Sequence, residues 1–239
     1  MHKYCKGMFC FSPPVMLATF FIEIGLALLT ILRYKVNAVG RLVIALLIFL
    51  AVFQAAEFNV CAAAWVDPMV ASRIGYVAIT LLPPLGLHLA YVLADAKKRP
   101  LLMPAYLSCA AFVIFFLTIG NSLAGHVCQG NYVIFQLAPG SEWLYSLYYY
   151  GWLFVTVLLC ARLVRGKKQN VRKALWGLAI GYCAFIIPTT TANIINPQTI
   201  RGIPSVMCGF AVLLALTLVF WVLPHKGELR QWWTISRRS

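Results

Sequence analysis

The sequence predicts an all-α, polytopic membrane protein of seven transmembrane helices, with its N-terminus outside and its C-terminus in the cytoplasm. Hydrophobic residues make up 62% of the 239 positions and only 11% are charged, whereas a soluble domain of this size typically carries about 25% charged residues. We therefore expect lipid to surround much of the chain. Apolar stretches near the ~20 residues needed to cross ~30 Å of hydrocarbon recur seven times, over residues 13–33, 42–61, 73–94, 101–121, 143–163, 173–195 and 203–224.

The breaks between these stretches are short and carry charged or turn-forming residues, as at 95–100, 166–170 and 196–197. The longest break, about 122–142, leaves no room for a soluble domain. We predict one transmembrane domain over residues 1–224 and a short basic cytoplasmic tail over 225–239. The tail either lies along the membrane surface or forms a disordered end.

The distribution of Lys and Arg predicts the orientation, because these residues are enriched in cytoplasmic loops. With the N-terminus outside, all but four of the 20 basic residues fall on the cytoplasmic side; the exceptions are Lys3, Lys6, Arg73 and Arg201. This bias requires an odd number of spans. It also explains the formal charge of +14 by membrane topology, so that no nucleic-acid partner is expected.

Four cysteines fall at or beyond the predicted outer face, where an oxidising compartment allows disulfides to persist. They are Cys5, Cys10, Cys61 and Cys128, and four cysteines allow three pairings. One bridge between Cys61 and Cys128 would tie the long outer loop to the second helix and leave Cys5 to pair with Cys10. The alternative is that some of them stay reduced. The other four cysteines fall inside predicted spans, where a thiol is usually a small packing residue.

Polar side chains inside the spans are the candidate ligand-binding residues, because an ionisable group in hydrocarbon is costly and marks function by default. They are Glu23, Gln54, Glu57, His88, Thr190 and Asn193. Gln54 and Glu57 share one face of the second helix at positions i and i+3. We expect a polar cavity, open to the outside, between the first, second, third and sixth helices, with the tyrosines of the fifth helix as a lid.

The alternative is that these groups form hydrogen bonds between helices and stabilise packing by about 1 kcal/mol or less each. That interpretation suits Gln54 and the threonines best. Glu23 and Glu57 favour function, because a carboxylate at that depth needs a partner or a proton. His88 is interpreted as a hydrogen-bonded helix contact more readily than as a ligand.

Several chemistries lack the residues they require, and we expect no cofactor and no metal. The last predicted helix has no lysine for a retinal Schiff base, and His88 is the one histidine within the predicted spans, so paired haem ligands are absent. Asp67 and Asp95 both fall in loops, which leaves no buried Asp for a zinc site or a Ser/His/Asp triad. An enzyme is less favoured, although Cys10 and Ser12 lie near the outer mouth.

Two partial resemblances add to this interpretation. The segments 8–12 (Met-Phe-Cys-Phe-Ser) and 53–57 (Phe-Gln-Ala-Ala-Glu) resemble an uncharacterised family of small bacterial membrane proteins, which open with Met-Cys-Phe-Ser and carry Gln/His-x-x-Glu in the second helix. The chain departs from that pattern through extra residues before Cys10 and through Phe9. Residues 74–93, with Pro83, Pro84 and His88, resemble the seven-helix sensor region found ahead of some bacterial histidine kinases. These resemblances imply a multi-pass protein of the bacterial inner membrane.

Three functions remain open. The leading hypothesis is a protein that binds a small ligand from the outer side, as a sensor or accessory subunit that acts through a membrane or cytoplasmic protein partner. The alternative is a small transporter or channel that uses Glu23 and Glu57, although no internal repeat is evident. The third is a membrane enzyme that acts on lipid at the outer mouth.

Overall fold

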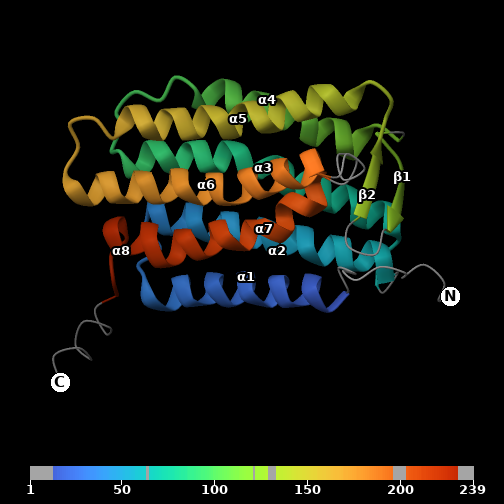
Figure 1. Cartoon of the computed structure of the whole chain (residues 1–239), viewed down its shortest axis with the longest axis horizontal. Helices are drawn as coiled ribbons and strands as arrows, with labels where there is room; N and C mark the ends of the chain where they lie inside the picture. The colour runs from blue at the N-terminus through green and yellow to red at the C-terminus, as the bar shows by residue number, and fades with distance from the viewer. Residues whose placement is uncertain (1–12, 63–64, 121, 129–132, 196–202, 231–239) are drawn as a thin grey trace.

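The computed structural model describes residues 13–62, 65–120, 122–128, 133–195 and 203–230. Within them the chain forms a bundle of long helices that run along one common direction, with a β-hairpin at one end (Figure 1). The helices are α1 (Pro13–Arg33), α2 (Ala38–Ala62), α3 (Pro68–Leu93), α4 (Leu102–Thr118), α5 (Ser141–Leu163), α6 (Gln169–Ile195) and α7 (Ile203–Thr217); α7 continues through the π-turn η2 (Leu218–Val222) into α8 (Leu223–Lys226).

Six of the described helices are long and apolar enough to cross a membrane, counting α7, η2 and α8 as one. This confirms a multi-pass membrane protein built from helices. Large apolar side chains point away from the bundle along its length, as lipid requires; Leu107, Leu158 and Ile187 are each about 60% exposed. A soluble protein rarely exposes so much contiguous apolar surface.

The helix α4 is shorter than the predicted stretch 101–121. It has 17 residues, which span about 25 Å at 1.5 Å per residue. The chain leaves the helix at Ile119 and Gly120, whose carbonyl groups accept hydrogen bonds from the Arg73 guanidinium at 3.5 and 2.6 Å. These carbonyl groups are thus satisfied by a side chain of α3 instead of a further helical turn.

The boundaries of α2 and α3 follow from side-chain caps. The Asn37 Oδ1 atom accepts a hydrogen bond from the Gly40 N–H at 3.0 Å, so α2 begins before the predicted residue 42. A Cβ atom at Gly40 would lie 2.8 Å from the Lys35 carbonyl oxygen, which makes glycine necessary in this tight turn. Asp67 caps α3 by accepting from the N–H groups of Met69 and Val70, as acidic residues commonly do at helix N-termini.

The predicted loop 122–142 contains a two-stranded antiparallel sheet that the sequence did not suggest. Strand β1 (Leu123–Cys128) pairs with β2 (Val133–Leu137). A disulfide between Cys61 and Cys128 joins β1 to the end of α2, with a Cα–Cα distance of 5.8 Å. The pairing of these two cysteines is confirmed, whereas Cys5 and Cys10 lie outside the described residues.

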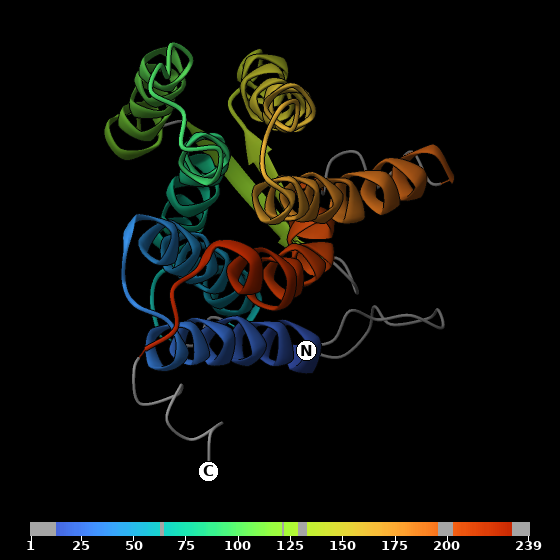
Figure 2. The ribbon, with the colours of Figure 1, turned by 90° about the vertical axis from the view of Figure 1, so that its left-hand side faces the viewer.

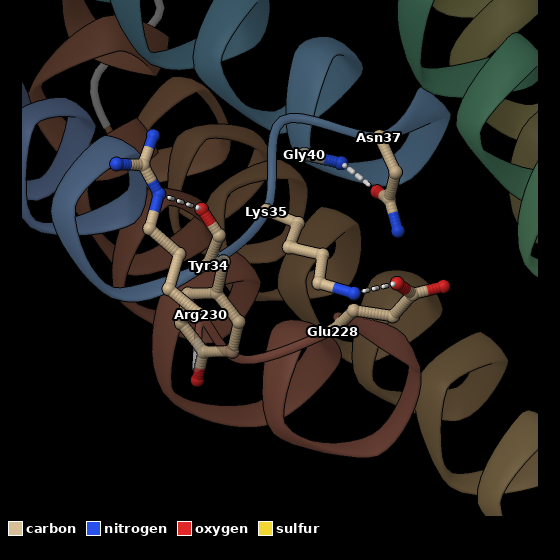
Figure 3. A network of polar contacts seen from close by, with 6 residues as sticks. All are labelled: Tyr34, Lys35, Asn37, Gly40, Glu228 and Arg230. Atoms are coloured by element: carbon tan, nitrogen blue, oxygen red, sulfur yellow. Dashed lines mark hydrogen bonds and ion pairs between the residues drawn. The ribbon is translucent and has the colours of Figure 1, made fainter. Parts of the chain in front are cut away.

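The opposite end of the bundle carries most of the positive charge, and we call it the basic end. Of the described Lys and Arg residues, Arg73 alone lies at the hairpin end. The segment after α8 folds back on the turn between α1 and α2: the Lys35 N–H donates to the Glu228 carbonyl oxygen at 2.7 Å, and the Arg230 N–H donates to the Arg33 carbonyl oxygen at 3.1 Å. Figure 3 shows the Lys35–Glu228 ion pair and the Arg230 side chain, which donates a hydrogen bond to the Tyr34 carbonyl oxygen.

Two further contacts join the loops of the basic end. The Lys226 ammonium group pairs with Asp95, between α3 and α4. The Lys167 ammonium group donates to the Ala94 carbonyl oxygen at 2.6 Å. The bundle therefore continues to Lys226, and the first four residues after it are held in place; residues 231–239 of the predicted tail lie outside the described part.

Removing the Cys61–Cys128 bridge by substituting both cysteines with alanine should lower the free energy of unfolding by about 2–4 kcal/mol. The bridge closes a loop with a sequence separation of 67, and this constraint on the unfolded chain is lost in the variant. Chemical unfolding in detergent micelles, followed by tryptophan fluorescence, measures the change. The control is Cys183→Ala, which removes a free thiol of α6; an equal loss in that variant would contradict the prediction.

Candidate functional site

Three polar side chains of α1 and α2 are buried inside the bundle, and we call Glu23, Gln54 and Glu57 the carboxyl cluster. Glu23 lies midway along α1, and Gln54 and Glu57 lie one turn apart near the hairpin end of α2. Their exposed fractions are 0%, 1% and 1%. The two carboxyl groups are close enough to interact electrostatically. The structure therefore encloses the cluster, where the sequence had suggested a cavity open to the outside.

Most polar atoms of the carboxyl cluster have no hydrogen-bond partner among the described residues. Both carboxyl oxygens of Glu23, both amide atoms of Gln54 and the Oε1 atom of Glu57 are buried and unpaired. An unpaired buried polar group costs about 1–3 kcal/mol, and more if it is charged. Hydrogen bonds between helices, the alternative to a functional site, are thus not made by Glu23 or Gln54 in this structure.

Asn59, two residues beyond Glu57 on α2, provides a direct contrast. Its Nδ2 atom donates to the Val66 carbonyl oxygen at 2.7 Å, and its Oδ1 atom accepts from the N–H groups of Trp65 and Val66 at 2.8 and 3.1 Å. This amide is 4% exposed and fully used in holding the turn after α2. Burial on α2 does not by itself leave an amide without partners.

The helix α7 forms the third wall of the cluster. It packs against both α1 and α2, and α6 packs on its other side (Figure 2). Ser205 and Cys208 of α7 are each 2% exposed. The Ser205 hydroxyl group hydrogen-bonds to the Glu57 carboxyl group, and Cys208 lies within electrostatic range of Glu23 and Glu57. The sequence had suggested the sixth helix for this position.

Ser205 also connects the cluster to the β-hairpin. Its Oγ atom accepts a hydrogen bond from the Val133 N–H at 3.1 Å, which leaves the hydroxyl proton for Glu57. From the same strand, the Phe135 ring packs edge-on against Tyr76, with ring centroids 5.3 Å apart, and lies 6.1 Å from the ring of Phe53. Val133 is fully buried and Phe135 is 5% exposed. The hairpin thus closes the bundle at the end nearest to Glu57.

The predicted residues of α6 do not form a described wall of the cluster. Thr190 is exposed, and its hydroxyl group donates to the Ile186 carbonyl oxygen of its own helix at 2.8 Å. Thr189, which is fully buried, makes the equivalent bond to Phe185 at 2.7 Å. Asn193 belongs to α6, but its side chain lies outside the described part. An apolar groove of about 420 Å³ follows α5 and α6 instead, lined by Val157, Trp176, Ala179, Ile180, Cys183, Ala184, Ile187 and Pro188.

His88 lies in the half of α3 nearest to the basic end, away from the carboxyl cluster. Its Nδ1 atom shares a hydrogen bond with the Tyr106 hydroxyl group of α4 at 3.0 Å, and its Nε2 atom lies 3.4 Å from the Arg99 guanidinium. It therefore connects α3 with α4, as a helix contact does. Cys10 and Ser12, predicted at the outer mouth, lie outside the described residues.

The tyrosines of α5 do not form a lid. Tyr145, Tyr148 and Tyr149 are all less than 10% exposed; the rings of Tyr145 and Tyr148 pack against Phe112 of α4, and Tyr145 also packs against Tyr76 of α3. The Tyr148 hydroxyl group donates to the Thr80 carbonyl oxygen at 2.7 Å. This carbonyl group is the one that Pro84, four residues later, cannot satisfy because proline has no N–H.

No known protein family, curated protein or solved structure matches this chain significantly. The resemblances to a family of small bacterial membrane proteins and to kinase sensor regions therefore stay predictions. Among the described residues, no group of three or more His, Cys, Asp and Glu side chains is arranged to hold a metal ion. The carboxyl cluster is therefore the candidate functional site.

Ser205 is the site residue that sequence reasoning missed. Substituting Ser205 with alanine should lower the free energy of unfolding by about 1–3 kcal/mol, because it leaves the buried Val133 N–H without an acceptor. Chemical unfolding in detergent measures the change. The control is Thr191→Val, since Thr191 is exposed and bonds only to the Ile187 carbonyl oxygen of its own helix among the described contacts. Equal stability of Ser205→Ala and the parent protein would contradict the described hydrogen bond.

The variants Gln54→Leu and Asn59→Leu should change stability in opposite directions. Gln54→Leu removes two unpaired polar atoms and should raise the free energy of unfolding by about 1–2 kcal/mol. Asn59→Leu breaks three hydrogen bonds and should lower it by about 1–3 kcal/mol. Parallel unfolding curves of the two variants give the comparison, and a loss in Gln54→Leu equal to that in Asn59→Leu would show that Gln54 stabilises packing.

Proposed function

We propose that the protein crosses the bacterial inner membrane seven times, with the hairpin end outside and the basic end in the cytoplasm. Two observations support this orientation. The positive charge gathers at the basic end, as expected for the cytoplasmic side, and the Cys61–Cys128 disulfide lies at the other end, as expected for an oxidising compartment. The first residue of α1 and the last of α8 lie at opposite ends (Figure 1), which fits an odd number of spans.

Within this arrangement, the protein binds a small ligand from the outer side through Glu23, Gln54 and Glu57, as a sensor or accessory subunit. The unpaired, fully buried polar atoms of these three side chains carry this proposal. A buried polar group without a partner calls for an explanation, such as a functional role or a bound water or ion, and an ionisable residue inside a membrane marks a functional site by default. The hairpin would have to move for the ligand to reach Glu57, and a membrane or cytoplasmic partner at the basic end would receive the signal.

A transporter or channel is the second candidate. It is favoured by the positions of the two carboxyl groups, since Glu23 lies at the middle of α1 and Glu57 lies nearer to the hairpin end of α2. Interacting carboxyl groups at different depths are suited to pass a proton or a cation between them. This candidate predicts flux, whereas the sensor predicts binding without flux.

The proposed function predicts that a compound from a mixed library of small neutral, anionic and cationic molecules raises the melting temperature of the protein in nanodiscs, and that Glu57→Gln abolishes the rise. A ligand at 100 times its Kd stabilises the folded state by about 2.7 kcal/mol, which a thermal scan detects. The matched control is Glu142→Gln, which removes an exposed carboxyl group at the same end of the bundle.

Flux measurements in proteoliposomes complete this test. Stabilisation without transport of the same compound supports a sensor or accessory subunit, and transport that is lost in Glu57→Gln would replace it by the transporter. A library that contains no stabilising compound, or compounds that stabilise Glu57→Gln equally well, would contradict binding at this site.

A further inference from the structure

We propose that the ligand of the carboxyl cluster is a small monovalent cation, an alkali-metal ion or an ammonium group, held between Glu23, Gln54 and Glu57. The inference rests on the proposed function and specifies the chemistry of the same site. It goes beyond the presence of two acidic residues, because Gln54 contributes an unpaired amide that is 99% buried on the same face of α2 as Glu57.

The unpaired atoms of the cluster are mainly acceptors. Glu23 provides two oxygens, Glu57 provides Oε1 and Gln54 provides its amide oxygen, whereas the Gln54 amide nitrogen is the one unpaired donor among them. Such a set suits a ligand that has positive charge and accepts no hydrogen bonds. An ammonium group presents three N–H donors, which matches one acceptor from each of the three side chains.

No cation of the described chain compensates Glu23 or Glu57. The basic residues of α1 and α2 are Arg33 and Arg41, near the basic end, and α7 has none before Lys226 of α8. The described salt bridges, Lys35–Glu228 and Lys226–Asp95, also lie at the basic end. A carboxylate inside a membrane protein needs a cation or a proton, so a bound cation would supply the positive charge that these helices lack near the cluster.

The other polar groups beside the cluster do not provide positive charge. Cys208 of α7 and Tyr76 of α3 are within electrostatic range of Glu57, and both side chains are neutral or acidic. The Ser205 hydroxyl group donates to Glu57 and stabilises a carboxylate there. Glu23 and Glu57 are within electrostatic range of each other, so a cation held between them neutralises the carboxylate that forms when one of them loses its proton.

The number of ligands favours a monovalent over a divalent ion. Calcium takes six to eight oxygen ligands, and magnesium retains several waters in an octahedral shell. The cluster offers four unpaired oxygens, two of Glu23, one of Glu57 and one of Gln54, and its three members are at most 1% exposed. An enclosed site with few ligands suits an ion that loses its hydration shell readily.

The cation enters as a proton leaves. With no cation bound, the neutral cluster carries a proton on each carboxyl group. Binding of one monovalent cation releases one of these protons to the solvent, and the net charge of the cluster is unchanged. Proton release can therefore be measured together with binding.

The experiment uses the full-length protein in nanodiscs of one lipid composition. Melting temperatures are recorded in N-methyl-D-glucamine chloride, in which sodium, ammonium, methylammonium or calcium chloride replaces part of the salt at constant ionic strength. Proton release is followed with a pH indicator in weak buffer. The variants are Glu23→Gln and Glu57→Gln, which keep the side-chain shape, and the control is Glu142→Gln.

We expect a saturable rise in melting temperature with sodium or with an ammonium ion, accompanied by proton release, and an apparent affinity that falls by about tenfold or more in Glu23→Gln and Glu57→Gln but not in the control. The relative responses to sodium and to the ammonium ions identify the cation. An equal rise in all variants would show a general salt effect, and a response to calcium alone would show a divalent site; either result overturns the proposal.

The identity of the cation and the proposed ligand-binding function are tested by different outcomes. If no monovalent cation has an effect, but a neutral or anionic compound stabilises the protein through Glu57, the cation is wrong and the proposed function stands. If neither cations nor any library compound stabilise the folded protein, both are wrong. In that case, folding of the variants is checked by their unfolding curves, so that a loss of structure is not mistaken for a loss of binding.

Discussion

A chain surrounded by lipid has to satisfy its backbone hydrogen bonds within itself, and most of this structure follows from that constraint. It explains why the spans are helices and why two of the interruptions have a side-chain partner. Pro84 cannot bond to the Thr80 carbonyl group, and Tyr148 of α5 donates to that group instead. Where α4 ends, the Arg73 guanidinium takes the place of the missing N–H groups.

The carboxyl cluster contains five of the eight buried polar side-chain atoms that lack a hydrogen-bond partner in the described structure; the others belong to Ser122, His126 and Tyr182. In the turn after α2, the Asn59 amide is paired with backbone groups; the polar atoms of Glu23 and Gln54 are not paired. Replacing such groups by apolar residues is often neutral or stabilising, so their presence is not explained by stability. This cluster is the site at which we propose that a ligand binds.

The helices were predictable because hydrophobic length alone determines a membrane span. Their order in space was not, since apolar stretches of similar composition give no indication of their neighbours, and α7 occupies the position expected for the sixth helix. Ser205 was missed because a single serine at the start of an apolar stretch is ordinary, and its role depends on Val133, 72 residues away. The β-branched and aromatic residues of β2 were the available signal for the hairpin.

The Cys61–Cys128 bridge has a consequence for how the protein is made. The two cysteines are separated by α3 and α4, so their sulfur atoms meet only when these helices lie as an antiparallel pair with both ends on one side. In the proposed seven-span topology, a chain in which one of the two helices failed to cross would leave the thiols on opposite sides of the bilayer. Formation of the disulfide therefore requires that both helices are correctly inserted. The redox state of Cys61 distinguishes correctly inserted molecules from incorrectly inserted ones.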